Sequence, residues 1–337
     1  MPADRNSQRI VVAGASSLLG SELKSLLEES RFAGWDLRLV DEDQAAGILT
    51  EAGGEAALIQ GVEEDTFQGA RFAFLTGSHG FGKRCLGPAR GAGATVIDLS
   101  HASMSAPDGL PWFPKIEQLS GRVASKKSNV FGVCSAGGTA IASLALMLRR
   151  HGWQRLVAVV NQPVSAAGRY GVEELETQTS QLLSFQTVGN RVFGTQAAFN
   201  MLPRYGPESR VGLADKLFEL RAEIAVAVVD PAEVLKISVN LVHAPVFYGT
   251  TFSACVDLEK TTEQATLVAA SREAGFVVVP SGEAAPSNVS VAGDAALYLG
   301  EPCRDRTREN TWWFWGAGDN LRVPAANGIR LAEWLDS

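Results

Sequence analysis

Cys134 is the residue whose type and position most directly suggest chemistry. It lies in residues 129–139, just before a stretch in which Ile141, Leu144 and Leu148 recur at helical spacing. A thiol at a helix N-terminus is exposed to the positive end of the helix dipole, which favours the thiolate. Thiolates attack aldehyde and acyl-phosphate carbons. Cys134 is therefore a candidate nucleophile, and buried packing is the alternative role for a lone cysteine.

A second candidate site is a glycine-containing turn near the start of the chain. Residues 9–13 are a short apolar run that predicts a buried strand, and Leu19 and Leu23 begin a helical pattern. Between them, residues 14–20 read GASSLLG. Glycines at such a junction allow close approach of a pyrophosphate, which the helix N-terminus attracts. Ser17 replaces the middle glycine of the usual pattern, so its hydroxyl either crowds a pyrophosphate or bonds to it. A turn without a ligand is the alternative.

Asp41 extends this prediction to the adenosine end of a dinucleotide. It follows a predicted strand at residues 36–40 and lies 21 residues after Gly20. An acid at that distance can accept hydrogen bonds from a ribose, and it would repel a 2′-phosphate. The prediction is NAD or NADP, with NAD favoured, and an acidic surface loop is the alternative. The residues expected to contact this cofactor are Gly14, Ser16, Ser17, Leu18, Leu19, Gly20 and Asp41.

The surrounding pattern predicts an α/β chain of two domains. Strand-like runs alternate with helical stretches over the first ~130 residues, which favours a doubly wound parallel sheet of Rossmann type. These runs are residues 9–13, 36–40, 71–76 and 94–98. Later runs predict an α+β domain on a mostly antiparallel or mixed sheet, followed by a final helix. They are residues 156–160, 235–242, 252–258 and 275–279, with a helical stretch at 172–183 and the last helix at 328–335.

Bulk composition narrows the class of protein. The 337 residues are too many for one ordinary domain, and the net charge of −7 with no basic run argues against a nucleic-acid partner. No apolar run reaches the ~18 residues of a membrane span, and the polar N-terminus has no signal-peptide pattern. The four cysteines have no close spacing that suggests a disulfide or a metal site. A cytoplasmic protein acting on a small molecule is expected.

Several segments together resemble aspartate-semialdehyde dehydrogenases. Residues 161–168 (NQPVSAAG), 198–203 (AFNMLP), 244–250 (APVFYGT) and 319–322 (DNLR) match segments of that family in the same order, so the resemblance covers nearly the whole chain. Residues 164–175 are most similar to the USG-1-like branch, whose catalytic pattern is altered. A relative of N-acetyl-glutamyl-phosphate reductase is a third alternative, since it shares the chemistry, but no segment favours it.

The resemblance implies a fold, a partner and a reaction. It implies a dinucleotide-binding domain at residues 1–133, a dimerisation and substrate domain at 134–315, and a C-terminal segment at 316–337 whose helix packs on the first domain. It also implies a homodimer in amino-acid biosynthesis. The reaction would be NADP-dependent and phosphate-linked, interconverting L-aspartate semialdehyde and aspartyl phosphate through a cysteine thiohemiacetal. No metal is implied.

Residue by residue, the resemblance assigns four roles. Cys134 matches the nucleophile and Gln162 the glutamine that orients the intermediate. Ser165 and Asn320 match positions near the nicotinamide end of the cofactor.

The departures from the family pattern are as informative as the matches. Thr250 stands where the family has its acid/base histidine, and His243 where it has the arginine that binds the substrate carboxylate. Met104 stands where a phosphate-binding arginine is expected, and Val133 replaces the asparagine before the cysteine. Two hypotheses follow: an oxidoreductase with altered chemistry, in which His243 still contacts substrate, or a non-catalytic paralogue that acts as a dimeric binding protein.

Two further features remain open at this point. His79 and His101 follow predicted strands at the sheet edge where a cofactor binds, so each is a candidate replacement base, with a structural loop histidine as the alternative. Residues 312–315 read WWFW, which predicts a strand with alternate faces buried or a dimer contact, and less readily a ligand-stacking site.

Overall fold

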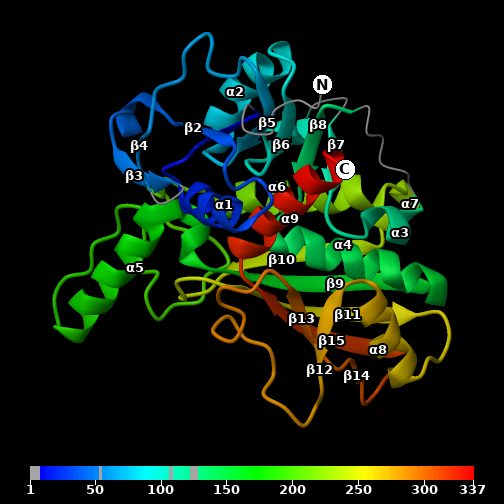
Figure 1. Cartoon of the computed structure of the whole chain (residues 1–337). Helices are drawn as coiled ribbons and strands as arrows, with labels where there is room; N and C mark the ends of the chain where they lie inside the picture. The colour runs from blue at the N-terminus through cyan, green and yellow to red at the C-terminus, as the bar shows by residue number, and fades with distance from the viewer. Residues whose placement is uncertain (1–7, 53–54, 106–108, 122–127) are drawn as a thin grey trace. The chain divides into compact units, whose positions relative to one another are not determined.

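The computed structural model describes residues 8–52, 55–105, 109–121 and 128–337 (Figure 1). The chain forms two compact units. The first comprises residues 1–114, 122–134 and 324–337, and the second comprises residues 115–121 and 135–323. The chain passes to the second unit for residues 115–121, returns to the first, and leaves it again after Cys134, and the end of the chain belongs to the first unit.

The first unit contains a six-stranded sheet in which every pairing is parallel, in the order β2-β1-β5-β6-β8-β7. Its central strands are almost entirely buried, as expected for a parallel sheet covered on both faces. The strand order changes direction between β1 and β5, which marks the carboxyl edge where ligands bind in doubly wound folds. The predicted Rossmann-type architecture is confirmed. The strands are β1 (Arg9–Ala13), β2 (Asp36–Val40), β5 (Ala70–Leu75), β6 (Thr95–Asp98), β7 (Leu110–Trp112) and β8 (Val130–Val133).

Helices and short elements complete the first unit. They are α1 (Leu18–Glu29), η2 (Asp43–Ala45), α2 (His79–Gly91), η3 (Ala102–Ser105), the small hairpin β3 (Leu49–Ala52) and β4 (Glu55–Leu58), and most of α9 (Arg322–Leu335).

Helix α9 returns to the first sheet, as the resemblance implied. A Cβ atom added at Gly328 would lie 3.4 Å from the Phe74 ring and 3.6 Å from Ile97, so the helix backbone packs directly on β5 and β6. Arg31 ties its far end by pairing with Asp336 at 3.1 Å. The close approach at Gly328 explains why the last helix can cover this face.

The second unit contains a mixed sheet, also as predicted, in the order β10-β9-β11-β15-β13-β12, with β14 pairing β15. β9 and β10 are parallel, as are β12 and β13, and the other pairs are antiparallel. The strands are β9 (Trp153–Gln162), β10 (Ile237–His243), β11 (Thr250–Leu258), β12 (Phe276–Val279), β13 (Leu297–Gly300), β14 (Cys303–Arg304) and β15 (Thr311–Gly318).

Helices of this unit pack against one face of the sheet through α4, α6 and α8 (Figure 1). Helix α4 is buried along its whole length, which explains its continuous run of small and apolar residues. The helices are α3 (Ile116–Ser120), α4 (Ala136–Leu148), η4 (Arg149–His151), η5 (Val164–Ala167), α5 (Gly168–Leu183), α6 (Leu213–Val228), α7 (Pro231–Val234) and α8 (Gln264–Glu273). No helix within the described residues is long and apolar enough to cross a membrane.

The aromatic run at residues 312–315 is a strand with alternate burial, as predicted. Trp312 and Phe314 are 2% and 1% exposed, whereas Trp313 and Trp315 are 44% and 41% exposed on the opposite face of β15. The helices α4 and α6, which pack on β9, β10 and β11, lie on the other face of the sheet. Large apolar side chains therefore remain uncovered on this face.

Candidate active-site segments

The turn after β1 has the backbone geometry of a phosphate-binding turn. Gly14 has φ +98°, and a Cβ there would lie 2.1 Å from the backbone nitrogen of Gly77. A Cβ at Gly20 would lie 2.2 Å from the Gly14 carbonyl oxygen. Both positions therefore require glycine, and the turn leads directly into the first residue of α1.

Ser17 points into the protein rather than toward a ligand. As the N-cap residue of α1, its hydroxyl accepts from the Gly20 amide and donates to the Thr76 carbonyl, both at 2.9 Å. These bonds hold it away from the position in which it would crowd or bind a pyrophosphate, so neither expected alternative describes this geometry. The amides of Leu18 and Leu19 have no acceptor among the described residues. They remain as donors for an anion at the helix N-terminus.

Asp41 stabilises the same turn. One carboxylate oxygen accepts from the Ser16 amide at 2.8 Å and from the Ser16 hydroxyl at 2.6 Å, and the other accepts from the Glu42 amide at 2.8 Å. Asp41 is 7% exposed. Glu42 pairs with Arg84 at 3.2 Å, which offsets part of its charge. This geometry gives Asp41 a structural role and does not by itself favour NAD over NADP.

Cys134 lies at the junction of β8 and α4, as predicted, and is buried. Its amide donates to the Trp112 carbonyl at 3.1 Å, which extends the pairing of β7 and β8 by one residue. The next residue, Ser135, is the N-cap of α4 and accepts from the Gly138 amide. The strand and the cap together fix the backbone on both sides of the thiol. None of the four cysteines, all within the described part of the chain, forms a disulfide.

Glu223 is a residue at this helix start that the sequence analysis missed. Its carboxylate accepts from the Ser135 hydroxyl at 2.6 Å and from the Ser135 amide at 3.2 Å, and the side chain is 0% exposed. A Cβ at Gly138 would lie 1.8 Å from it, so glycine makes room for the carboxylate. A negative charge there opposes the effect of the α4 dipole on a thiolate. The feature of the sequence that could have indicated its role is a single glutamate among the apolar residues of the buried face of α6.

Gln162, Ser165 and Asn320 lie on or beside the second sheet. Gln162 is the last residue of β9 and pairs in register with His243. Asn320 donates to the Ser165 hydroxyl at 3.0 Å and accepts from the Gly249 amide at 2.8 Å. The structure thus brings together two residues 155 positions apart to which the resemblance gave one role.

Thr250 begins β11, where its methyl group faces the first turn of α4. Its Cγ2 atom would lie 3.9 Å from a Cβ at Gly137. The side chain is 8% exposed. Position 250 therefore adjoins the helix that starts after Cys134, and the methyl group it presents there cannot donate or accept a proton.

His243 is enclosed by protein on every side. It is 0% exposed, and Phe193 and Tyr205 flank its ring with centroids 5.5 and 5.4 Å away. Nε2 lies 3.3 Å from the Ala197 carbonyl, which only accepts, so Nε2 carries the proton. Nδ1 then accepts from the Tyr205 hydroxyl at 3.3 Å. Both ring nitrogens are occupied in the neutral tautomer, so this geometry favours a structural role over the predicted substrate contact.

Burial lowers the pKa of His243, although the bond to the Ala197 carbonyl acts in the opposite direction. An unfolded histidine gains a proton below about pH 6.5, whereas the folded protein resists it. Above that pH the protonation of His243 does not reduce the free energy of unfolding. Below it the unfolded chain binds a proton that the folded protein does not, so the free energy of unfolding falls by up to about 1.4 kcal/mol per pH unit. Urea unfolding between about pH 7.5 and 5.5 should show this slope. His243→Gln should remove it, and equal slopes in the two proteins would contradict this assignment.

The other predicted histidines and Met104 occupy the carboxyl edge of the first sheet. His79 is half-buried at the start of α2, and its Nδ1 has no hydrogen-bond partner within the described residues. His101 adopts a left-handed backbone, with φ +63°. Asp98 holds this turn by accepting from the Ser100 and Ser103 hydroxyls at 2.6 and 2.7 Å. Met104 packs beside Gly132 of β8 and cannot bind phosphate as an arginine would.

Comparison with known proteins yields one consistent family. Residues 144–323 match the family model described as semialdehyde dehydrogenase, dimerisation domain. A USG-1 protein homolog of Azotobacter vinelandii is 29% identical over 335 residues, which is 97% of each chain. Aspartate-semialdehyde dehydrogenase of Rickettsia bellii is 26% identical over 97% of each chain.

Solved structures agree on the fold. A probable aspartate-semialdehyde dehydrogenase from Pseudomonas aeruginosa superposes with a TM-score of 0.85 at 24% identity, covering 98% of this chain and 99% of that one. An enzyme of that name from Candida albicans, solved with NADP, gives a TM-score of 0.68 at 14% identity, covering 98% of each chain.

Proposed function

Since the chain belongs to the semialdehyde dehydrogenase family, we propose that it is a homodimeric oxidoreductase that binds NAD or NADP and acts on an aldehyde through Cys134. The observation that carries the proposal is the turn around Gly14, where the amides of Leu18 and Leu19 have no acceptor within the part of the chain that the structure describes. Placement in the cytoplasm and in amino-acid biosynthesis is part of the same proposal.

The residues of the turn suit a nicotinamide dinucleotide. Gly14 and Gly20 leave the backbone open to a pyrophosphate, and the amides of Leu18 and Leu19 would donate to it. Ser165 and Asn320 would hold the nicotinamide end. When bound, the nicotinamide supplies a hydride acceptor. We favour NAD on net charge alone, because Asp41 and Glu42 place two negative charges after β2 and Arg84 offsets one of them. Tighter binding of NADPH than of NADH would overturn that preference.

Cys134 would carry the covalent chemistry. Its thiolate adds to the aldehyde carbon, forming a C–S bond and a thiohemiacetal oxygen that takes a proton. The same carbon would then lose hydride to the acceptor that a bound nicotinamide supplies, and the oxygen would lose its proton to solvent, which gives a thioester. Phosphate then attacks the acyl carbon, the C–S bond breaks, and the thiolate and an acyl phosphate are released. Gln162 would orient the intermediate through its side-chain amide.

The positions that differ from the family pattern would make this protein a poor aspartate-semialdehyde dehydrogenase. Thr250 cannot exchange the thiohemiacetal proton, a function typically worth about 10²–10⁴ in rate. His243 is neutral and already bonded, and Met104 offers phosphate no charge. An altered substrate is therefore part of the proposal. The same observations favour one second candidate, a non-catalytic dimer that binds a dinucleotide.

One experiment separates these two functions. Purified wild-type protein and Cys134→Ala would be assayed with L-aspartate semialdehyde and a panel of other aliphatic aldehydes, with phosphate and each cofactor, beside a direct measurement of NADH and NADPH binding. Cofactor reduction that Cys134→Ala abolishes supports the oxidoreductase. Cofactor binding without turnover supports the non-catalytic dimer. A folded protein that binds neither cofactor would contradict both functions.

The uncovered face of the second sheet would form the dimer contact. Ser253 pairs in register with Val159 on one side and Trp315 on the other, so exposed side chains of β9, β11 and β15 form one continuous surface. Trp313 and Trp315 bond to Asp305 and the Pro286 carbonyl through their indole nitrogens, at 2.9 and 2.7 Å. Ring positions fixed in this way are suited to an interface because little side-chain entropy is lost on association.

Replacing Trp315 with aspartate should weaken the dimer. Loss of a central aromatic contact typically costs about 2 kcal/mol or more, which raises the dissociation constant about 30-fold. Sedimentation across a protein concentration series would measure it. Phe218→Ser, at an aromatic of α6 in the helical layer that is 74% exposed against 41% for Trp315, is the control and should leave the dimer intact. An unchanged dissociation constant in Trp315→Asp would exclude this face.

A further inference from the structure

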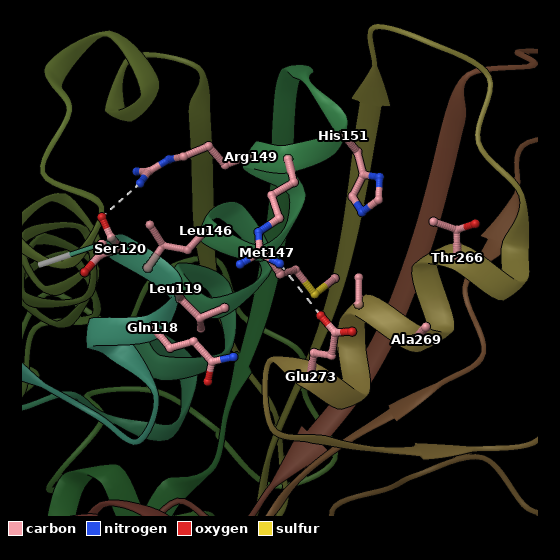
Figure 2. A pocket seen from close by; sticks show the side chains of 13 residues that line it. Gln118, Leu119, Ser120, Leu146, Met147, Arg149, His151, Thr266, Ala269 and Glu273 are labelled. Carbon is pink, nitrogen blue, oxygen red and sulfur yellow. Dashed lines mark hydrogen bonds and ion pairs between the residues drawn. The ribbon is translucent and has the colours of Figure 1, made fainter.

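The second unit contains a cavity at the place where three helices end (Figure 2). α3 ends at Ser120, α4 at Leu148 and α8 at Glu273, and η4 closes one side. The cavity has a volume of about 430 Å³, which is within the range of small-molecule sites. No residue assigned above to the dinucleotide, to Cys134 chemistry or to the dimer face lines it.

The floor of the cavity is apolar. Leu146 and Met147 of α4 are 2% and 4% exposed, and Leu119 of α3 and Ala270 of α8 complete the lining on either side. Figure 2 shows Leu119, Leu146 and Met147 together between α3 and α8. An aliphatic group of a few carbons can lie on this floor with its surface removed from water.

The rim carries one positive and one negative group that are only loosely paired. Arg150 and Glu273 lie 3.9 Å apart, and their side chains are 73% and 66% exposed. Such a pair contributes little to stability, so a ligand can separate it at small cost. Arg149 differs: it holds Glu233 at 2.6 Å and also donates to the Val228 carbonyl, so it is already occupied.

The electrostatic potential at this rim depends on the ends of the helices as well as on the charged side chains. Helix C-termini carry partial negative charge, and α4 and α8 both end here. Lys115 bonds to the Glu273 backbone carbonyl, the last of α8, at 2.6 Å. The Glu273 carboxylate does not take part in that bond and faces Arg150. The helix C-termini and Glu273 therefore favour an ammonium group, whereas a carboxylate needs the Arg150 side chain or His151, which extends toward α8 in Figure 2, as a hydrogen-bond donor.

We propose that this cavity binds a free α-amino acid with an uncharged aliphatic side chain. Its carboxylate would pair with Arg150, its ammonium with Glu273, and its side chain would lie on the Leu119, Met147 and Ala270 floor. The site uses no residue of the proposed oxidoreductase chemistry, so binding would persist whether or not the protein turns over an aldehyde.

Calorimetry on the full-length protein tests the assignment with L-leucine and three analogues. L-leucinamide lacks the carboxylate, 4-methylpentanoate lacks the ammonium, and 3-methylbutylamine lacks the carboxylate carbon altogether. L-leucine is expected to bind, and each analogue to bind at least about tenfold more weakly, since each loses a charge-assisted hydrogen bond. If 4-methylpentanoate or L-leucinamide bound as tightly as L-leucine, the zwitterion assignment would be overturned. If none of L-leucine, L-valine and L-methionine bound at millimolar concentration, the proposal would also be overturned.

Variants locate the binding in this cavity. Arg150→Gln and Glu273→Gln change exposed side chains, so they should fold normally and weaken L-leucine binding about tenfold or more. Ala270→Phe should fill the cavity and abolish binding. Arg272→Gln, on the same helix but outside the lining, is the matched control. Unchanged affinity in both Arg150→Gln and Glu273→Gln would place the ligand elsewhere and refute the proposal. Cys134→Ala should bind L-leucine as wild type does, so a failed oxidoreductase assay leaves this test valid.

Discussion

Replacing Thr250 with histidine should raise the rate of Cys134-dependent aldehyde oxidation by about 10²–10⁴-fold, the usual contribution of a positioned acid/base. The side chain at position 250 faces the first turn of α4, the helix that begins after Cys134. A histidine there could accept the thiohemiacetal proton, which threonine cannot. The gain should appear in kcat rather than in KM, because His243 remains neutral and bonded to Tyr205 and Ala197. Single-turnover reduction of the cofactor at saturating aldehyde would measure it.

Thr250→Asn is the matched control for this substitution. Asparagine also adds a polar side chain to a site that is 8% exposed, but it transfers no proton near neutral pH. The histidine effect should also disappear in Thr250→His/Cys134→Ala. A folded, dinucleotide-binding Thr250→His protein with no gain would mean that the missing acid/base is not what limits the reaction. That result would favour the non-catalytic dimer.

Local sequence patterns predicted most of the fold because the main elements are locally consistent. β1, β2, β5 and β6 read as apolar runs that end in glycine or a polar residue, and the structure gives them the expected parallel pairing. The aromatic run at residues 312–315 predicted a strand with alternate faces buried, and Trp312 and Phe314 are its buried side chains. The helix α6 was not predicted, since charged residues at 215–223 interrupt its apolar face. The short strands β13 and β14 were missed for lack of length.

The predicted site differs from the structure wherever a side chain's role depends on distant partners. Asp41 has the spacing of a ribose-binding acid, yet Ser16 takes one of its oxygens. His243 aligns with a substrate-binding position, yet its ring is held by residues 38 and 46 positions away. Neither contact leaves a periodic signal in the sequence, because hydrogen bonds between loops have no fixed spacing. Ser165 and Asn320 were found only because the family resemblance linked them.

Replacing Glu223 with alanine should destabilise the protein by about 3–5 kcal/mol. The Ser135 hydroxyl and amide each lose a bond to a charged acceptor, typically worth about 1.5–3 kcal/mol, and a buried cavity remains. Because Ser135 also caps α4, the loss should loosen the helix start beside Cys134. Equilibrium denaturation of wild type and Glu223→Ala would measure the change in the free energy of unfolding. Glu223→Gln keeps one acceptor oxygen and nearly the same volume, so its loss should be smaller.

A double-mutant cycle with Gly138→Ala tests whether contact with Gly138 is the cause. A Cβ at position 138 would lie 1.8 Å from the Glu223 carboxylate, so Gly138→Ala alone should destabilise the protein by displacing that group. In the Glu223→Ala background the added methyl group enters the vacated space, and most of its cost should vanish. The two substitutions should therefore show a coupling of at least about 1 kcal/mol. Additive effects would mean that Glu223 stabilises α6 independently of the α4 N-terminus, and the role assigned to it beside Cys134 would be wrong.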